Sequence, residues 1–188
     1  MAKINWKGGA LLSPVPAVLV TSADGEKQDV CTIAWTGILS TSPAKTYVSV
    51  RPSRLTHELI TKSREFCINL PSSRLVRIVD FCGVKSGKEL DKFAILEITP
   101  EKSKEVSCPS IAECPVTIEC KVTDIIPLGS HDMFIADIVS VGVDENLLDD
   151  TGKLRLEKAG LLAYSHGSYF ALGKKIGSFG FSVKKRKR

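Results

Sequence analysis

The first part of the chain alternates between short apolar runs and polar turns, a pattern typical of consecutive β-strands. Residues 17–21 form one apolar run, and residues 30–39 form a second run that is rich in β-branched side chains. Between them lies Asp24-Gly25, a dipeptide that favours a hairpin turn. The pattern therefore predicts two antiparallel strands over residues 17–21 and 30–39.

A strand that leads into a helix follows. Residues 47–51 alternate between polar and apolar positions, which predicts a strand with its polar side chains on one face. The alternation ends at Pro52. A helix is then expected to run to about Arg64, with Ser53 or Thr56 as its N-cap.

The rest of the chain predicts further strands and short helices. Strands are expected over residues 66–70, 116–122 and 133–143, with a bend over residues 125–129. A helix capped by Ser72 or Ser73 presents Leu75, Ile78, Val79 and Cys82 on one face. The less regular segments are a polar stretch that ends in a short helix (85–93), a loop (102–110), a turn-rich arm (146–158) and a mixed apolar and aromatic segment (161–170).

Several of these strands follow one another without an intervening helix, which argues against a parallel sheet. We therefore predict a mainly β fold with α insertions, an antiparallel barrel with short flanking helices. The chain has neither the glycine-rich dinucleotide fingerprint nor the P-loop motif, so neither a Rossmann fold nor a P-loop fold is supported.

The length of 188 residues and the 43% of hydrophobic residues suit a single domain over residues 1–188. No apolar run reaches the ~20 residues that a membrane span needs, and the N-terminus lacks a secretory signal. We expect a soluble, cytoplasmic protein with no membrane partner. The five cations of residues 184–188 equal the whole net charge of +5, so the rest of the chain is electrically balanced. We expect this tail to be disordered and solvated rather than to bind nucleic acid, although such a tail can bind polyanions.

The cysteines do not show the spacing of a metal site or of a thioredoxin-like motif, because no C-x-x-C pair occurs. We expect no metal. Cys31, Cys67 and Cys82 lie in apolar segments and are expected in the core. Cys108 and Cys114 each precede a proline in a predicted loop, and we expect free thiols; a redox role is the less favoured alternative.

Cations and hydroxyls gather where the predicted helix begins. Arg51, Ser53, Arg54 and Thr56 lie around its N-terminus, where unpaired backbone N–H groups and the helix dipole favour an anion. The alternative is an ordinary capped turn with solvated arginines. In the same way, Trp35 is either a core residue or the wall of a cofactor site.

Six segments, taken in order, resemble the flavin reductase-like family and within it the flavoredoxins. These segments are TIAWTG (32–37), SVRPSRLTH (49–57), EFCINL (65–70), SGKELDKF (86–93), GSHDMF (129–134) and IGSFGFSV (176–183). The resemblance implies a split β-barrel of Greek-key type that binds FMN without a covalent bond, usually at a homodimer interface. It also implies that a reduced nicotinamide, NADH or NADPH, reduces the flavin, or that electrons pass between redox proteins.

The resemblance also implies roles for individual residues. The strand formed by Thr32, Ile33, Ala34, Trp35 and Thr36 is expected along the isoalloxazine, and Ser49, Val50 and Arg51 along the ribityl chain and the ring edge. The phosphate is expected to be held by Ser53, Arg54, Thr56 and His57, together with Ser86 and Lys92. His131 is expected at the ring face where nicotinamide stacks, as the catalytic residue, with Tyr164 and His166 at the same mouth.

One motif departs from the family pattern. The family more often carries Gly-Asp-His where this chain has Ser130-His131-Asp132, and this difference bears on the role of His131 rather than on the fold. The leading hypothesis is an FMN-dependent NAD(P)H:flavin or acceptor oxidoreductase. The alternatives are a flavoredoxin-type electron carrier with a protein redox partner and no nicotinamide activity, and a binding module without redox activity.

Overall fold

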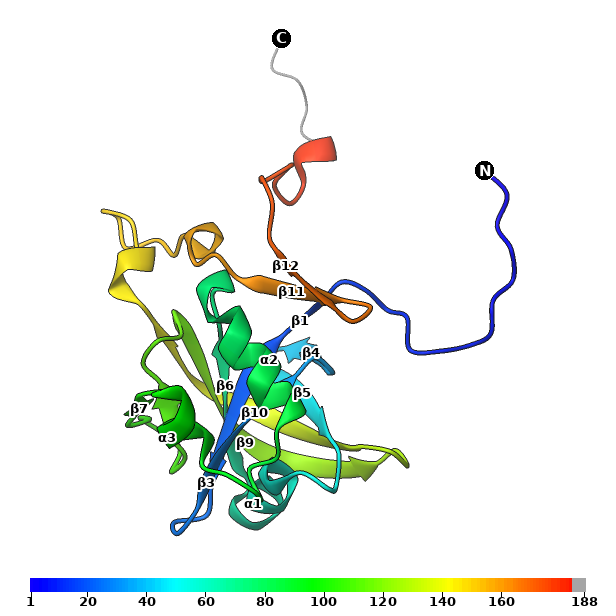
Figure 1. The fold of residues 1–188 in the computed structure, drawn as a ribbon. Helices are drawn as coiled ribbons and strands as arrows, with labels where there is room; N and C mark the ends of the chain where they lie inside the picture. The colour runs from blue at the N-terminus through cyan, green and yellow to red at the C-terminus, as the bar shows by residue number, and fades with distance from the viewer. Residues whose placement is uncertain (184–188) are drawn as a thin grey trace.

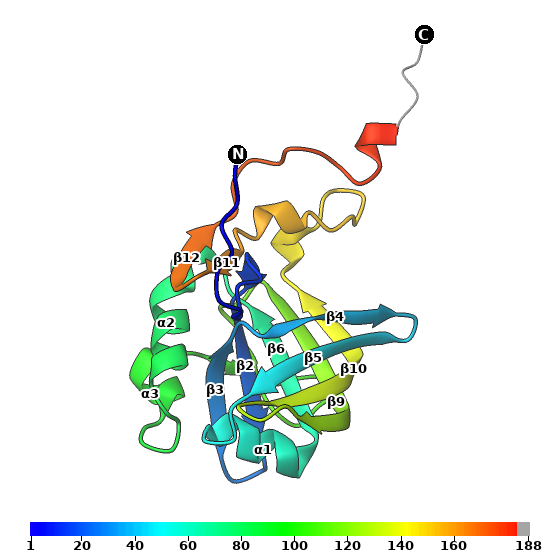
Figure 2. The same cartoon turned by 90° about the vertical axis from the view of Figure 1, so that its right-hand side faces the viewer.

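A curved antiparallel sheet forms the body of the protein in the computed structural model, which describes residues 1–183 (Figure 1). The predicted tail of residues 184–188 lies outside the described residues. From edge to edge the seven strands are β3 (Gln28–Ile33), β2 (Val18–Ala23), β6 (Glu65–Leu70), β9 (Val116–Pro127), β10 (Asp132–Val143), β5 (Ala44–Val50) and β4 (Thr36–Thr41). Every neighbouring pair is antiparallel. Residues of β3 also contact β5 across the sheet, so the sheet curls toward a barrel (Figure 2). The predicted mainly β, split-barrel fold is confirmed.

Short helices and two small sheets cover this body. The helices are α1 (Leu55–Ser63), η1 (Ser73–Leu75), α2 (Val76–Val84), α3 (Lys92–Leu96), η2 (Glu145–Leu147), η3 (Leu156–Lys158) and η4 (Phe181–Val183). The small sheets pair β1 (Val15–Pro16) with β11 (Leu162–Ser165) and β12 (Ser168–Ala171), and β7 (Pro100–Glu101) with β8 (Ser110–Ile111).

The core has two main layers that meet at β2. The inner layer fills the curl of the sheet with fully buried side chains such as Val20, Phe66 and Phe134. The outer layer lies between β2, β3 and the helices α2 and α3, and includes Leu19 and Val79. Because both faces of β2 are covered, all six of its residues are buried.

The predicted strand over residues 30–39 is wrong in one respect, because the chain leaves one sheet edge and joins another. Residues 34 and 35 lie between β3, which pairs with β2, and β4, which pairs with β5. The crossing is fixed by side-chain and backbone bonds to β5. The Thr36 hydroxyl donates to the Tyr47 carbonyl at 2.5 Å, and the Ser49 N–H donates to the Trp35 carbonyl at 2.9 Å.

Three other predicted elements also differ. The predicted bend over residues 125–129 begins only after Pro127, because β9 stays paired with β10 as far as that residue, and the chain then bends at Gly129, whose φ angle is positive. The segment 161–170 contains two strands, β11 and β12, joined by a turn in which His166 and Gly167 have positive φ angles. The residue that caps α1 is Arg54, in an extended conformation and without a side-chain cap, while Thr56 lies inside the helix.

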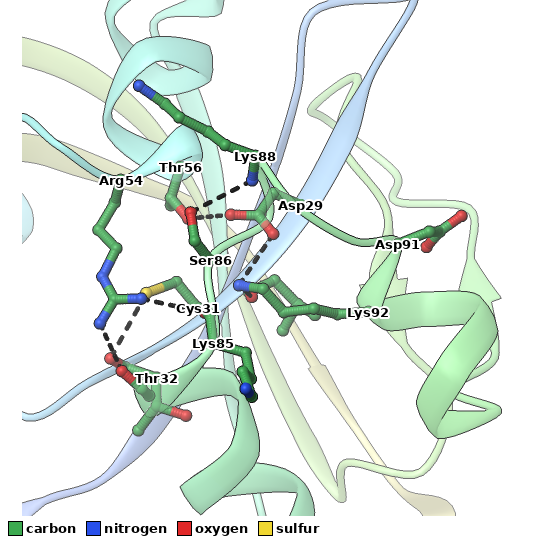
Figure 3. Close-up of polar contacts among 12 residues, drawn as sticks. Asp29, Cys31, Thr32, Arg54, Thr56, Lys85, Ser86, Lys88, Asp91 and Lys92 are labelled. Carbon is green, nitrogen blue, oxygen red and sulfur yellow. Dashed lines mark hydrogen bonds and ion pairs between the residues drawn. The ribbon is translucent and has the colours of Figure 1, made fainter.

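A buried ion pair joins the sheet to two helices. Lys92 Nζ, at the start of α3, lies 3.0 Å from Asp29 Oδ1 on β3, and the two side chains are 1% and 3% exposed. Lys92 also donates to the Val30 carbonyl, and the Thr56 hydroxyl of α1 donates to Asp29 Oδ2 at 2.6 Å (Figure 3). A Cβ at Gly87 would lie 2.2 Å from Asp29 Oδ1, so this position requires glycine.

All six cysteines are free and buried. This confirms Cys31, Cys67 and Cys82 as core residues. Cys108 and Cys114 lie in loops, as predicted, and these loop positions are buried. Burial raises the pKa of Cys67, Cys82 and Cys114 to about 12, so these thiols stay protonated and unreactive at neutral pH. Among residues 1–183, no helix is both long and apolar enough to cross a bilayer.

Replacing Lys92 by methionine tests the buried pair. K92M leaves the Asp29 carboxylate buried without its cation, which is expected to lower the free energy of unfolding by about 3–5 kcal/mol. Urea denaturation measures the change. The added substitution D29N removes the unpaired charge and is expected to recover part of the loss.

Lys88→Met is the matched control, because Lys88 is half-exposed and lies 3.8 Å from Glu58 at the surface. An exposed pair of this kind contributes at most about 1 kcal/mol. If K92M is as stable as K88M, the buried pair does not hold the helices to the sheet.

Candidate functional site

A cavity of about 360 Å³ opens where β3 gives way to β4. Because the resemblance implies a flavin beside this part of the chain, we call it the flavin-side cavity. Its walls come from the end of β3, the end of β5, the C-terminal part of α2, the loop before β10, and the β11–β12 hairpin. Ten of the residues predicted for the site line it: Thr32, Ile33, Ala34, Trp35, Ser49, Val50, Arg51, Arg54, His131 and Tyr164. The predicted strand and the predicted helix start therefore meet at one cavity.

The floor of the cavity is held against α2. The Thr32 hydroxyl donates to the Val79 carbonyl inside the helix. A Cβ at Gly83 would lie 3.4 Å from the Thr32 Cβ, so the strand and the helix approach closely at this glycine. Next to this floor, Ala34 and the 38%-exposed Trp35 belong to neither strand and line the cavity.

Two arginines give one side of the cavity a positive charge. Arg51 is exposed just after β5, and within residues 1–183 it forms no ion pair with a carboxylate. Arg54 lies differently, because its guanidinium donates to the last carbonyls of α2, those of Gly83, Val84 (3.4 Å) and Lys85 (3.0 Å) (Figure 3). It therefore caps the C-terminus of α2. Of the two, Arg51 is the one whose side chain is available to an anion.

His131 lies in the loop between β9 and β10. Its Nδ1 is 2.9 Å from the Ser130 hydroxyl. Partial burial, and secondarily the positive charge of Arg51, lower the pKa of His131 below its ordinary value. The imidazole is therefore neutral at neutral pH, with one nitrogen able to donate and the other able to accept a hydrogen bond.

Seven residues predicted for the site do not line this cavity: Thr36, Ser53, Thr56, His57, Ser86, Lys92 and His166. Lys92 and Thr56 are both bonded to Asp29 in the buried cluster described above. His57 Nε2 lies 2.8 Å from Asp132 Oδ2, and its ring packs edge-on against Phe134. In this structure the side chains of Lys92, Thr56 and His57 make contacts that stabilise the fold.

The other four of these residues lie nearer the surface. The Thr36 hydroxyl is bonded to β5, and Ser53 is exposed ahead of α1. The Ser86 hydroxyl accepts the Lys88 N–H at 3.3 Å, and His166 is exposed in the hairpin turn. Their predicted roles stay predictions.

Sequence reasoning missed two polar residues of the wall, Asp80 and Tyr169. The Tyr169 hydroxyl donates to Asp80 Oδ1 at 3.3 Å, and its ring meets the Tyr164 ring edge-on at 5.5 Å between centroids. Burial, together with the Asp80 carboxylate, raises the pKa of Tyr169 to about 12. A hairpin prediction within residues 161–170 would have brought the tyrosines together, because Tyr164 and Tyr169 are direct cross-strand partners.

These groups suit a small planar molecule with an anionic end. The volume lies within the range of about 300–1,000 Å³ that is usual for such sites. Aromatic rings, backbone next to a strand break, a neutral imidazole and a free guanidinium all converge on it. This donor set fits FMN, whose ring is flat and whose phosphate binds arginine bidentately.

Comparison with known proteins gives consistent results. The family model for the flavin reductase like domain matches residues 11–173. A flavoredoxin of Desulfovibrio vulgaris (Miyazaki F) shares 32% identity with a TM-score of 0.90, covering 97% of this chain and all of that one. An uncharacterized protein of Pyrococcus abyssi is 35% identical over 87% of this chain and 93% of its own length. An NADPH-flavin oxidoreductase of Streptomyces viridifaciens is 28% identical over 67% of this chain and 65% of its own.

The pKa of His131 tests the geometry of the cavity. This pKa is expected below the ordinary value of about 6.5. The substitution Arg51→Gln is expected to raise it, because the positive charge of Arg51 disfavours the protonated imidazolium. It is not expected to reach the ordinary value, since burial remains. A titration of the histidine ring protons by NMR measures both values.

The control is Arg74→Gln, which removes an exposed arginine that does not line this cavity. A His131 pKa that responds equally to R74Q and R51Q would contradict the placement of Arg51 beside the imidazole.

Proposed function

We propose that this chain, which belongs to the flavin reductase like family, binds FMN non-covalently in the flavin-side cavity and transfers hydride or electrons between NAD(P)H and the flavin or a downstream acceptor. The observation that carries the proposal is that one cavity holds both the Arg51 guanidinium, which forms no ion pair within residues 1–183, and a wall of backbone and aromatic rings. When bound, FMN supplies the redox chemistry, and the protein supplies placement and electrostatics.

Each wall has a separate task in this proposal. Arg51 binds the phosphate, and Ser49 and the backbone at Val50 lie along the chain that connects phosphate and ring. Ala34 and Trp35 line the ring. Arg54 fixes the C-terminal end of α2 and so positions the wall that α2 forms. Its N–H groups already donate to the carbonyls of that helix end, so it can bind the phosphate only by sharing these donors.

His131 is the residue proposed to face the nicotinamide. A neutral imidazole beside the cavity hydrogen-bonds the carboxamide without adding a second cation next to Arg51. Hydride transfer requires the nicotinamide carbon that gives up the hydride to lie close to the flavin nitrogen that accepts it. Orientation of the two rings therefore accounts for most of the catalysis. His131 thus acts by holding and orienting rather than by transferring a proton.

The second candidate is an electron carrier that receives electrons from a protein partner and not from a nicotinamide. It is favoured by the similarity to the Desulfovibrio flavoredoxin over nearly the whole of both chains. The exposed Trp35 at the opening leaves the ring region accessible to such a partner.

A homodimer is also part of the proposal. The N-terminal segment extends away from the body and exposes Trp6, and the C-terminal segment does the same with Phe179 (Figure 1). Ile38 on β4 and Val141 on β10 are also exposed. Sedimentation equilibrium is expected to give twice the 20.4 kDa of one chain; a mass of one chain at micromolar concentration would exclude the dimer.

Flavin titration followed by reduction tests the function. The protein is expected to bind FMN and turn yellow, and anaerobic NADH or NADPH is expected to bleach the visible absorbance. Bleaching by dithionite or a reduced protein, but by neither nicotinamide, would favour the carrier. If the protein has no affinity for FMN, both redox proposals are overturned, and the alternative of a binding module without redox activity remains.

A matched pair of variants locates the flavin. Arg51→Ala is expected to weaken FMN binding by about tenfold or more, because a hydrogen bond to a charged group contributes about 1.5–3 kcal/mol and about 1.4 kcal/mol is tenfold. Arg74→Ala, which removes an exposed arginine outside the cavity, is expected to leave FMN affinity unchanged. Equal affinities for R51A and wild type would remove Arg51 from the site.

A further inference from the structure

A second hollow lies on the outer side of α2, and we call it the outer recess. Its volume is about 450 Å³. It is lined by Val76, Arg77, Asp80, Phe81, Val84, Lys85 and Tyr169. Three of these residues, Asp80, Val84 and Tyr169, also line the flavin-side cavity. The two hollows therefore share a wall.

The shared wall is a contact between α2 and the β11–β12 hairpin. The strand β12 lies beside α2 in Figure 2, and the Tyr169 hydroxyl donates to Asp80 at 3.3 Å. Asp80 and Tyr169 form the rim between the two hollows, since the same side chains line both. A ligand longer than the flavin-side cavity reaches the outer recess by crossing this rim.

The outer recess combines an apolar surface with two cations. Phe81, Val84 and the ring of Tyr169 supply the apolar part. Arg77 and Lys85 are exposed, and neither forms an ion pair within the part of the chain that the structure describes.

One carboxylate faces these cations. Among the residues that line the outer recess, Asp80 is the acidic one, and it accepts the Tyr169 hydroxyl. The local charge thus favours an anion, and the apolar surface favours a flat ring beside it.

We propose that the outer recess binds the adenosine 2′-phosphate end of NADPH, with Arg77 and Lys85 recognising the phosphate. The inference rests on the proposed function, because it places the nicotinamide end of the same molecule in the flavin-side cavity near His131. A guanidinium binds a phosphate through two parallel hydrogen bonds, and an ammonium binds it as a point charge. The adenine ring packs on the apolar surface around Phe81.

This arrangement makes the chain selective for NADPH over NADH. NADH has a hydroxyl where NADPH has the 2′-phosphate, so it leaves Arg77 and Lys85 without an anion. Contacts so far from the reacting atoms contribute the same binding energy to the substrate and to the transition state. They therefore lower KM and leave kcat unchanged.

The double variant R77Q/K85Q, loaded with FMN, tests the assignment by steady-state kinetics. The KM for NADPH is expected to rise about tenfold or more, because two charge-assisted contacts are lost. The KM for NADH, both kcat values and the affinity for FMN are expected to change by less than about twofold. The control is R74Q/K88Q, which removes one arginine and one lysine that line neither hollow. Equal KM values for NADH and NADPH in the wild type would overturn the proposal.

Calorimetry with adenosine 2′,5′-bisphosphate gives a readout that needs no reduction of flavin. The FMN-loaded wild type is expected to bind this probe at least about tenfold more tightly than R77Q/K85Q does. If neither nicotinamide bleaches the flavin but this difference is seen, the proposed nicotinamide activity fails while the phosphate subsite holds. If the variant binds the probe as tightly as the wild type, the subsite is excluded whatever the kinetics show.

Discussion

The arrangement of strands and helices depends on the buried contacts of one carboxylate, that of Asp29. It lies on β3 and receives the Lys92 ammonium from α3 and the Thr56 hydroxyl from α1. These groups are buried, so none of them has water as an alternative partner, and each requires the others to be in place. One side chain thus sets the distance of both helices from the strand that forms the floor of the flavin-side cavity.

The rest of the cavity follows from two further constraints on the same strand. After Ile33 the chain leaves β2 and joins β5, and this crossing brings Ala34 and the exposed Trp35 into the same cavity wall as Arg51. On the other side, two hydrogen-bond donors hold α2 in place. The Thr32 hydroxyl donates to a carbonyl in the middle of the helix, and the Arg54 guanidinium donates to the carbonyls at its C-terminal end. The cavity is therefore a consequence of a strand that changes partners next to a helix whose end is fixed.

Local pattern was sufficient to predict most of the strands and the order of the short helices, and the family resemblance supplied ten of the residues that line the cavity. It was not sufficient where a partner distant in sequence decides the outcome. Lys92 is expected at the phosphate from the sequence, because nothing near it in the chain shows the buried Asp29 that pairs with it. The apolar run through residues 30–39 is continuous, so only pairing with two different strands reveals the break. Asp80 and Tyr169 are 89 residues apart, and only the folded chain brings them together.

The six buried thiols have a practical consequence. They are distributed over β3, β6, α2, β9 and the segment between β7 and β9, and none is more than 7% exposed. Cys67, Cys82, Cys108 and Cys120 are 0% exposed, so a thiol-specific alkylating reagent can react with each of these four only after its own part of the chain opens. The native sequence thus carries a set of kinetic reporters, and mass spectrometry of timed labelling can rank the opening rates of its segments without any engineered probe.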